Sequence, residues 1–215
     1  MANFPKIRPI EQQFENEKII KIREIQRQFQ SLRFQTGAGP YYTKEVIKCL
    51  EAGLLLAALQ VATALLELFV RDLLIIEIYK KEFPEGLTSS DYRKLGKIEK
   101  DIEDGHPRFY FNKIISELAK DNIIKEQDRE KIYSVYKNVR IPLHHGLTRR
   151  FVRLFSKVEI DDENDDPLVD TIFLRKSGRD HDLEEVLEDN TLNYLIIVVD
   201  FIMRYLPATN EVLSN

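Results

Sequence analysis

The sequence predicts an all-α fold, and two features of its 215 residues predict it. Apolar side chains recur every three or four positions along most of the chain, which is the spacing of an amphipathic helix. A hydrophobic content of 43% is enough to build a buried core between such helices. Residues 171–174 have a strand-like composition, but a run this short is more typical of a loop.

The first predicted helix lies between residues 10 and 34. Ile10, Phe14 and Ile22 begin its series of apolar positions, which are separated by charged and amide side chains. The glycines and proline at 36–40 end it. We expect this N-terminal amphipathic helix to belong to a helical arm at 1–42.

A second helical region runs from 43 to 81. As one straight helix it would be about 57 Å long at 1.5 Å per residue, which is long for this domain. The sequence is compatible with such a rod and with a bend at Gly53. Its apolar run contains Gln60 and Glu67, and therefore falls short of the ~20 uninterrupted residues that a membrane-spanning helix needs. The sequence predicts a buried helix and no membrane contact.

The middle of the chain divides into shorter helices. A loop is expected at 84–90, followed by a helix that Ser90 caps and that ends near Glu103. Two more helices are predicted at 109–120 and 126–139.

Pro142 disfavours helical geometry at the residue before it, so we expect a kink there and a new helix from about Leu143. Residues 159–170 hold seven carboxylates and should form a solvated loop. The last helix is expected from Asp189 or Asn190 to Leu206. The helical domain would then cover 43–206, with a C-terminal tail at 207–215.

The chain is acidic on balance, with a net charge of −4, but residues 137–157 reverse the sign. They carry six Lys or Arg and no Asp or Glu, and Arg140 lies five positions before His145. A guanidinium can grip a phosphate with two parallel hydrogen bonds, and histidine moves protons near neutral pH. These residue types suit cleavage of a phosphodiester without a metal, so RNA is the expected substrate.

The charged content of 32%, with a net charge of −4, predicts a cytoplasmic protein. Cys49 is the only cysteine, so neither a disulfide framework nor a cysteine-based zinc site is predicted. The first residues lack the apolar core of a signal peptide. We expect no metal and no cofactor.

Two segments resemble the HEPN superfamily. Residues 140–146 (RIPLHHG) match its Arg, four to six residues, His signature, and residues 57–71 (AALQVATALLELFVR) are similar to its early helix, which often ends in a buried acidic residue. The resemblance implies a bundle of four to five core helices that pairs as a homodimer. It also implies a metal-independent endoribonuclease of toxin–antitoxin or antiviral-defence systems, with an antitoxin or a defence-complex protein as partner.

The residues suggest a mechanism with separate roles. His145 would accept the proton of the ribose 2′-hydroxyl, Arg140 would stabilise the charge that develops on the phosphate, and His144 is either a second proton carrier or a solvent-facing side chain. The resemblance implies that Glu67 orients Arg140, whereas a local ion pair with Arg71 is the simpler alternative. RNA contacts are expected from Lys137, Arg149, Arg150 and Arg153, with Tyr136 or Phe151 for base stacking, unless these residues form a plain solvated face.

Two further alternatives remain open from the sequence. The chain could be a non-catalytic HEPN-type module that dimerises or binds a partner protein or a nucleotide, or a ribonuclease that acts only within a larger assembly. The acidic segment 159–170 either solubilises a loop or covers the basic helix until a partner displaces it.

Overall fold

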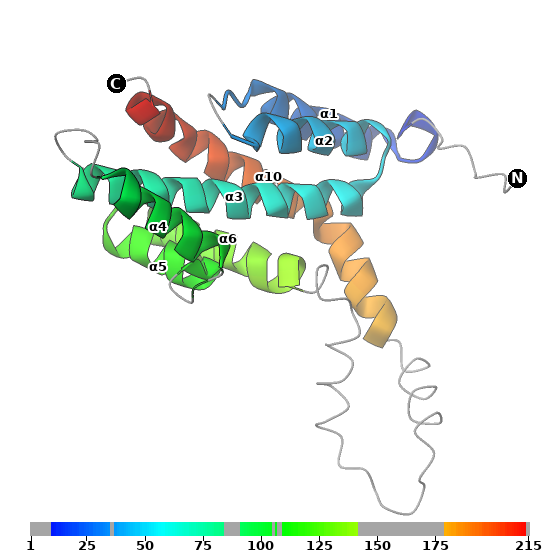
Figure 1. Cartoon of the computed structure of the whole chain (residues 1–215). Helices are drawn as coiled ribbons and strands as arrows, with labels where there is room; N and C mark the ends of the chain where they lie inside the picture. Colours follow the sequence, from blue (N-terminus) through cyan, green and yellow to red (C-terminus); the bar gives the residue numbers. More distant parts are fainter. Residues whose placement is uncertain are drawn as a thin grey trace, which may run out of the picture.

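A computed structural model describes residues 10–34, 37–83, 91–104, 106, 109–141 and 179–213, and within these ranges the chain is helical with no strand (Figure 1). The predicted all-α class is therefore confirmed. The elements in chain order are η1 (Ile10–Gln12), α1 (Asn16–Ser31), α2 (Gly39–Glu51), α3 (Leu55–Glu82), α4 (Tyr92–Glu103), α5 (Phe111–Lys120), α6 (Glu126–Val135), the π-helical segment η3 (Tyr136–Arg140) and α10 (Arg179–Leu213).

Helix α3 is the centre of the fold. In Figure 1 it runs across the middle of the molecule, with α1 and α2 on one side, α4, α5 and α6 on the other, and α10 crossing it. Phe69 of α3 joins these groups, because its ring makes edge-to-face contacts with Phe34 at 6.2 Å and with Phe201 of α10 at 6.1 Å. One continuous core therefore connects the N-terminal and C-terminal helices.

The bend at Gly53 is confirmed, and the alternative of one long rod is wrong. Gly53 has a φ of +71°, and the chain reverses there so that α2 and α3 pack against each other. A Cβ at this position would lie 2.7 Å from the side-chain oxygen of Gln13. Helix α2 begins at Gly39 rather than near 43, because Pro40 in the first turn needs no N–H partner.

The N-terminal helix is part of the core. Helix α1 is shorter than the predicted 10–34, and its buried Ile22, Ile25 and Phe29 belong to the same hydrophobic cluster as α3 and α10. The expected boundary at residue 42 falls inside α2. What the sequence indicates as an arm is therefore a packed helix of the bundle.

The last helix is longer than predicted at both ends. It starts at Arg179 rather than near 190, and it continues through Pro207 to Leu213, where a tail was expected. Leucine, glutamate and valine dominate residues 183–188, so helix propensity extends upstream of the apolar stretch. A proline inside a helix costs about 3 kcal/mol, which the buried side of α10 just before it offsets through residues such as Ile202 and Leu206.

A polar clamp fixes α10 to the start of α6. The guanidinium of Arg204 donates to both carboxylate oxygens of Asp128 at 2.7 and 2.6 Å. The hydroxyl of Tyr205 donates to Asp128 at 2.7 Å and accepts from the N–H of Lys125 at 3.0 Å. Burial alone raises the pKa of Asp128, but the hydrogen bonds from Tyr205 and Arg204 outweigh it, so the pKa is lowered.

Among the helices that the structure describes, none combines the length and apolar character required to cross a membrane.

Candidate functional site

The structure brings together Arg140 and Glu67, which lie 73 positions apart in the sequence. Nη2 of Arg140, at the end of η3, donates to Oε2 of Glu67 on α3 over 3.0 Å. The two side chains are only 14% and 21% exposed, so solvent screens this ion pair less than a surface pair. Glu67 thus contacts the motif arginine as the resemblance implies, while its part in catalysis stays a prediction.

A π-helical turn places Arg140 on the inner side of its helix. The N–H of Ile141 bonds to the carbonyl of Tyr136, five residues earlier. On this segment Val139 is fully buried, and the next side chain, Arg140, is only 14% exposed and reaches Glu67 of α3.

Tyr136 closes the site on the side of α5. Its ring stacks on Phe111 with centroids 4.4 Å apart and an interplanar angle of 13°. Burial, followed by the nearby Glu67 carboxylate, raises the pKa of Tyr136, so the phenol stays neutral. Phe111 already covers one face of this ring, so only the other face is left for the expected stacking on a base.

Arg71 adds a second guanidinium beside the pair. It is exposed and one helical turn from Glu67, yet within the described ranges no hydrogen bond or ion pair joins the two. The simple local ion pair is therefore wrong, and Glu67 turns to Arg140 instead. The charge of Arg71 acts on Tyr136, where it opposes, together with Arg140, the rise in pKa caused by burial and by Glu67. The sequence indicated Arg71 only as a partner of Glu67.

One donor of Arg140 has no partner in the described structure. Its Nε lies buried without a hydrogen bond. Leaving a buried donor unpaired costs about 1–3 kcal/mol, and such groups are uncommon outside sites where they serve a purpose. Lys137 lies on the same π-helical segment with its side chain exposed.

The other predicted site residues lie outside the described residues. These are His144, His145, Arg149, Arg150 and Arg153, and the same holds for Phe151, the expected kink at Pro142 and the acidic segment 159–170. Their roles stay predictions. Within the described part of the chain, no group of three or more His, Cys, Asp or Glu side chains could hold a metal ion.

No protein-family model, no curated protein and no solved structure matches the chain. The resemblance to the HEPN superfamily therefore stays a prediction from the sequence.

Proposed function

We propose that this chain is a HEPN-type, metal-independent endoribonuclease that acts as a homodimer in a toxin or antiviral-defence system. The observation that supports the proposal most is the sheltered ion pair between Arg140 and Glu67. It unites the two segments that carry the resemblance, which are far apart in the sequence and lie on different helices.

Arg140 is suited to bind the scissile phosphate. A guanidinium has five N–H groups, and the described contact with Glu67 uses one of them. The carboxylate fixes the plane of the guanidinium, and the remaining donors can bind the charge that develops on phosphate oxygens. Losing one such preorganised donor typically lowers the rate by about 10²–10³.

In the proposed mechanism the histidines carry out the proton transfers. His145 accepts the proton of the ribose 2′-hydroxyl, and the resulting alkoxide attacks the adjacent phosphorus. The bond from phosphorus to the 5′-oxygen breaks, and that oxygen takes a proton from a protonated His145 of a second copy, with His144 as the alternative donor. The products are a 2′,3′-cyclic phosphate and a 5′-hydroxyl. General acid–base help of this kind contributes about 10²–10⁴-fold.

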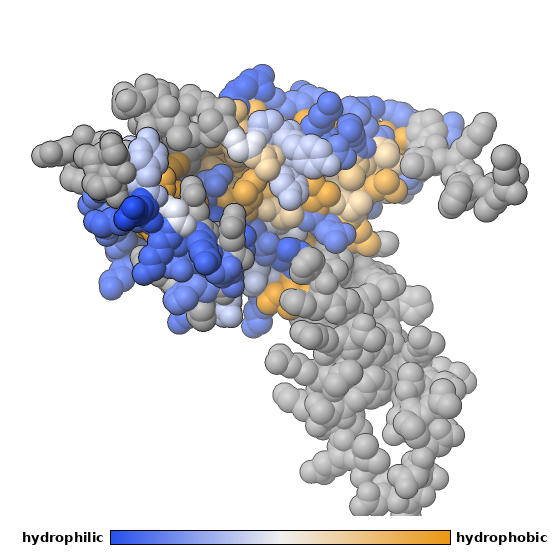
Figure 2. All heavy atoms as spheres, in the orientation of Figure 1, coloured by the Kyte–Doolittle hydropathy of each residue, from blue (hydrophilic) through white to orange (hydrophobic). Residues whose placement is uncertain are grey.

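The exposed side of α3 offers a surface for the second copy. Figure 2 shows apolar side chains gathered along the middle of this face, over α3 and between the α1–α2 and α5–α6 groups. By helical spacing Leu68 and Ile75 lie on the same side of α3 as Ala64, one and three turns from it, and all three are partly exposed. Glu67 and Arg71 belong to the same stretch of helix, so pairing through α3 would bring two Arg140 sites near each other.

The test is single-turnover cleavage of a mixed RNA substrate in the presence of a chelator. Chelator-resistant cleavage that ends in a cyclic phosphate is expected for the intact chain. Activity should fall by about 10²-fold or more in Arg140→Ala and in His145→Ala. Arg27→Ala, an exposed arginine on α1, is the matched control and should retain activity. Intact RNA at high protein concentration, or an equal loss of activity in the control variant, would refute the proposed ribonuclease activity.

A second function is favoured by the same ion pair, because it also ties η3 to α3. In a non-catalytic module that dimerises or binds a partner protein or nucleotide, Arg140 would serve stability alone. Arg140→Ala would then lower the free energy of unfolding, whereas neither the intact chain nor any variant would cleave RNA.

A further inference from the structure

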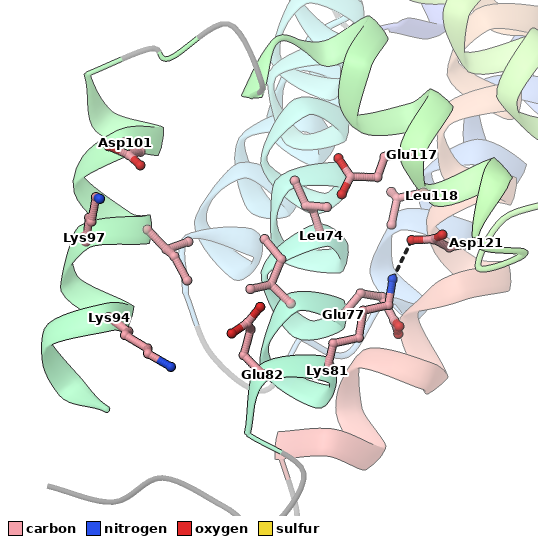
Figure 3. A pocket seen from close by; sticks show the side chains of 12 residues that line it. Leu74, Glu77, Lys81, Glu82, Lys94, Lys97, Asp101, Glu117, Leu118 and Asp121 are labelled. Atoms are coloured by element: carbon pink, nitrogen blue, oxygen red, sulfur yellow. Dashed lines mark hydrogen bonds and ion pairs between the residues drawn. The ribbon is translucent and has the colours of Figure 1, made fainter. Parts of the chain in front are cut away.

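A cavity of about 320 Å³ lies between α3, α4 and α5, at the end of the bundle formed by the last turns of α3. Its size is within the range of sites for small organic molecules. Figure 3 shows Lys94, Lys97 and Asp101 on α4, on one side of the cavity, and the lining side chains of α3 and α5 on the other. This cavity shares no lining residue with the Arg140–Glu67 site.

The floor of the cavity is apolar. Leu74 and Leu118 are 2% and 1% exposed, and Ile78 and Ile98 are partly buried beside them. A ligand with a hydrocarbon body would cover this floor and gain about 25 cal/mol per Å² of apolar surface removed from water.

Most of the negative side chains in the cavity are less exposed than the positive ones. The lining carboxylates of Glu77, Asp101 and Glu117 are partly buried and come from three different helices. The lining lysines are all exposed at the rim. Lys81 is paired with Asp121 at 2.6 Å, and Glu77 is paired at 2.9 Å with Lys80, which does not line the cavity. Lysine side chains commonly hold their ammonium groups out to solvent over apolar stems. Five carboxylates and three lysines line the cavity, so its lining is negative on balance.

This combination selects for an organic cation. A nucleotide or another phosphate compound would bring its negative charge toward the partly buried carboxylates, including the 13% exposed side chain of Glu77. A metal ion finds no suitable group of ligands in the described part of the chain. A neutral apolar molecule would desolvate the partly buried carboxylates without adding a positive charge beside them. Ammonium groups separated by methylene chains satisfy both the carboxylates and the floor.

We propose that the cavity between α3, α4 and α5 binds a linear aliphatic polyamine, with its methylene groups on Leu74 and Ile98 and its ammonium groups at Glu77 and Asp101.

The ligand would also hold α4 in place. Helix α4 is amphipathic, with Leu95 and Ile98 one turn apart, yet none of its described side chains is buried. Glu77 belongs to α3 and Asp101 to α4, so a molecule with an ammonium group at each would link the two helices. Amide hydrogen exchange in α4 should therefore slow when the ligand binds.

Titration calorimetry of the full chain with spermidine, at about 0.15 M salt to suppress diffuse attraction, tests the proposal. Saturable binding of one spermidine per chain is expected. Glu77→Gln and Asp101→Asn should each weaken it about tenfold or more, because each removes a charge-assisted contact. Glu24→Gln, an exposed carboxylate on α1, is the matched control and should leave the affinity unchanged.

The variant Lys94→Gln distinguishes a cationic ligand from an anionic one. Removing this rim charge should tighten spermidine binding, whereas the affinity for an anionic ligand would fall. Circular dichroism of each variant establishes that it is folded, and exchange of the α4 amides reports binding independently of heat. Absence of saturable binding, equal weakening in Glu24→Gln, or equal competition by magnesium at the same charge concentration would overturn the proposal. These outcomes involve no RNA and are independent of the ribonuclease assay.

Discussion

Replacing Glu67 by Gln removes the negative charge that faces Arg140 but keeps the size of the side chain. The ion pair is 3.0 Å long and both partners are less than a quarter exposed. A hydrogen bond to a charged group contributes about 1.5–3 kcal/mol, whereas removing one partner of a fully buried pair costs about 3–5 kcal/mol. Because this pair is partly sheltered, we expect the free energy of unfolding to fall by about 1.5–3 kcal/mol.

A double-mutant cycle isolates the interaction between the two side chains. Glu67→Gln, Arg140→Met and the double variant would be unfolded in urea and followed by circular dichroism. The loss in the double variant should be smaller than the sum of the single losses by about 1–2 kcal/mol, because the second substitution removes a partner that is already unpaired. Additive losses, within about 0.3 kcal/mol, would refute the coupling between the pair.

The same variants separate orientation from stability. If Glu67 holds the guanidinium for catalysis, Glu67→Gln should slow single-turnover RNA cleavage by about 10–10²-fold at a temperature where the variant is fully folded. Unchanged cleavage with reduced stability would show that the pair is structural only.

Three further predictions concern the fold. Tyr205→Phe removes the hydroxyl that binds Asp128, so the free energy of unfolding should fall by about 1–2 kcal/mol in urea; an unchanged value would exclude a stabilising clamp. Burial raises the pKa of Asp72 to about 6 from 3.8, so the folded state holds this proton more tightly and stability should fall as pH rises from about 4 to 6. Asp72→Asn should therefore stabilise the protein at pH 7 by about 1–2 kcal/mol after allowance for solvent screening, and a loss of stability there would contradict the shift. Gly53→Ala introduces a side chain at a φ of +71° and should lower the melting temperature, while Gly96→Ala, with open space around it, should raise it; equal effects would refute the argument.

Local patterns were sufficient for the helices whose ends carry strong signals. The end of α4 at Glu103, the end of α5 at Lys120 and the start of α6 at Glu126 agree with the sequence predictions. Each of these points is marked by breaker, turn or charged residues next to an apolar series. Where such signals were weak or misleading, as around Asp189 and Pro207, the ends of α10 were predicted wrongly. Helix propensity continues upstream of the apolar stretch, and the buried side chains just before Pro207 offset the cost of the proline.

The sequence by itself determined the helical class and the choice of Arg140 as the central residue of the candidate site, and it left a bend at Gly53 and one long rod as alternatives. Only the tertiary structure decided that Glu67 pairs with Arg140 rather than with its neighbour Arg71. The pairing of Glu67 with Arg140 depends on how α3 packs against η3. Contacts between distant segments arise from packing of the whole chain, whereas the spacing of residues within one helix encodes only its own local preferences.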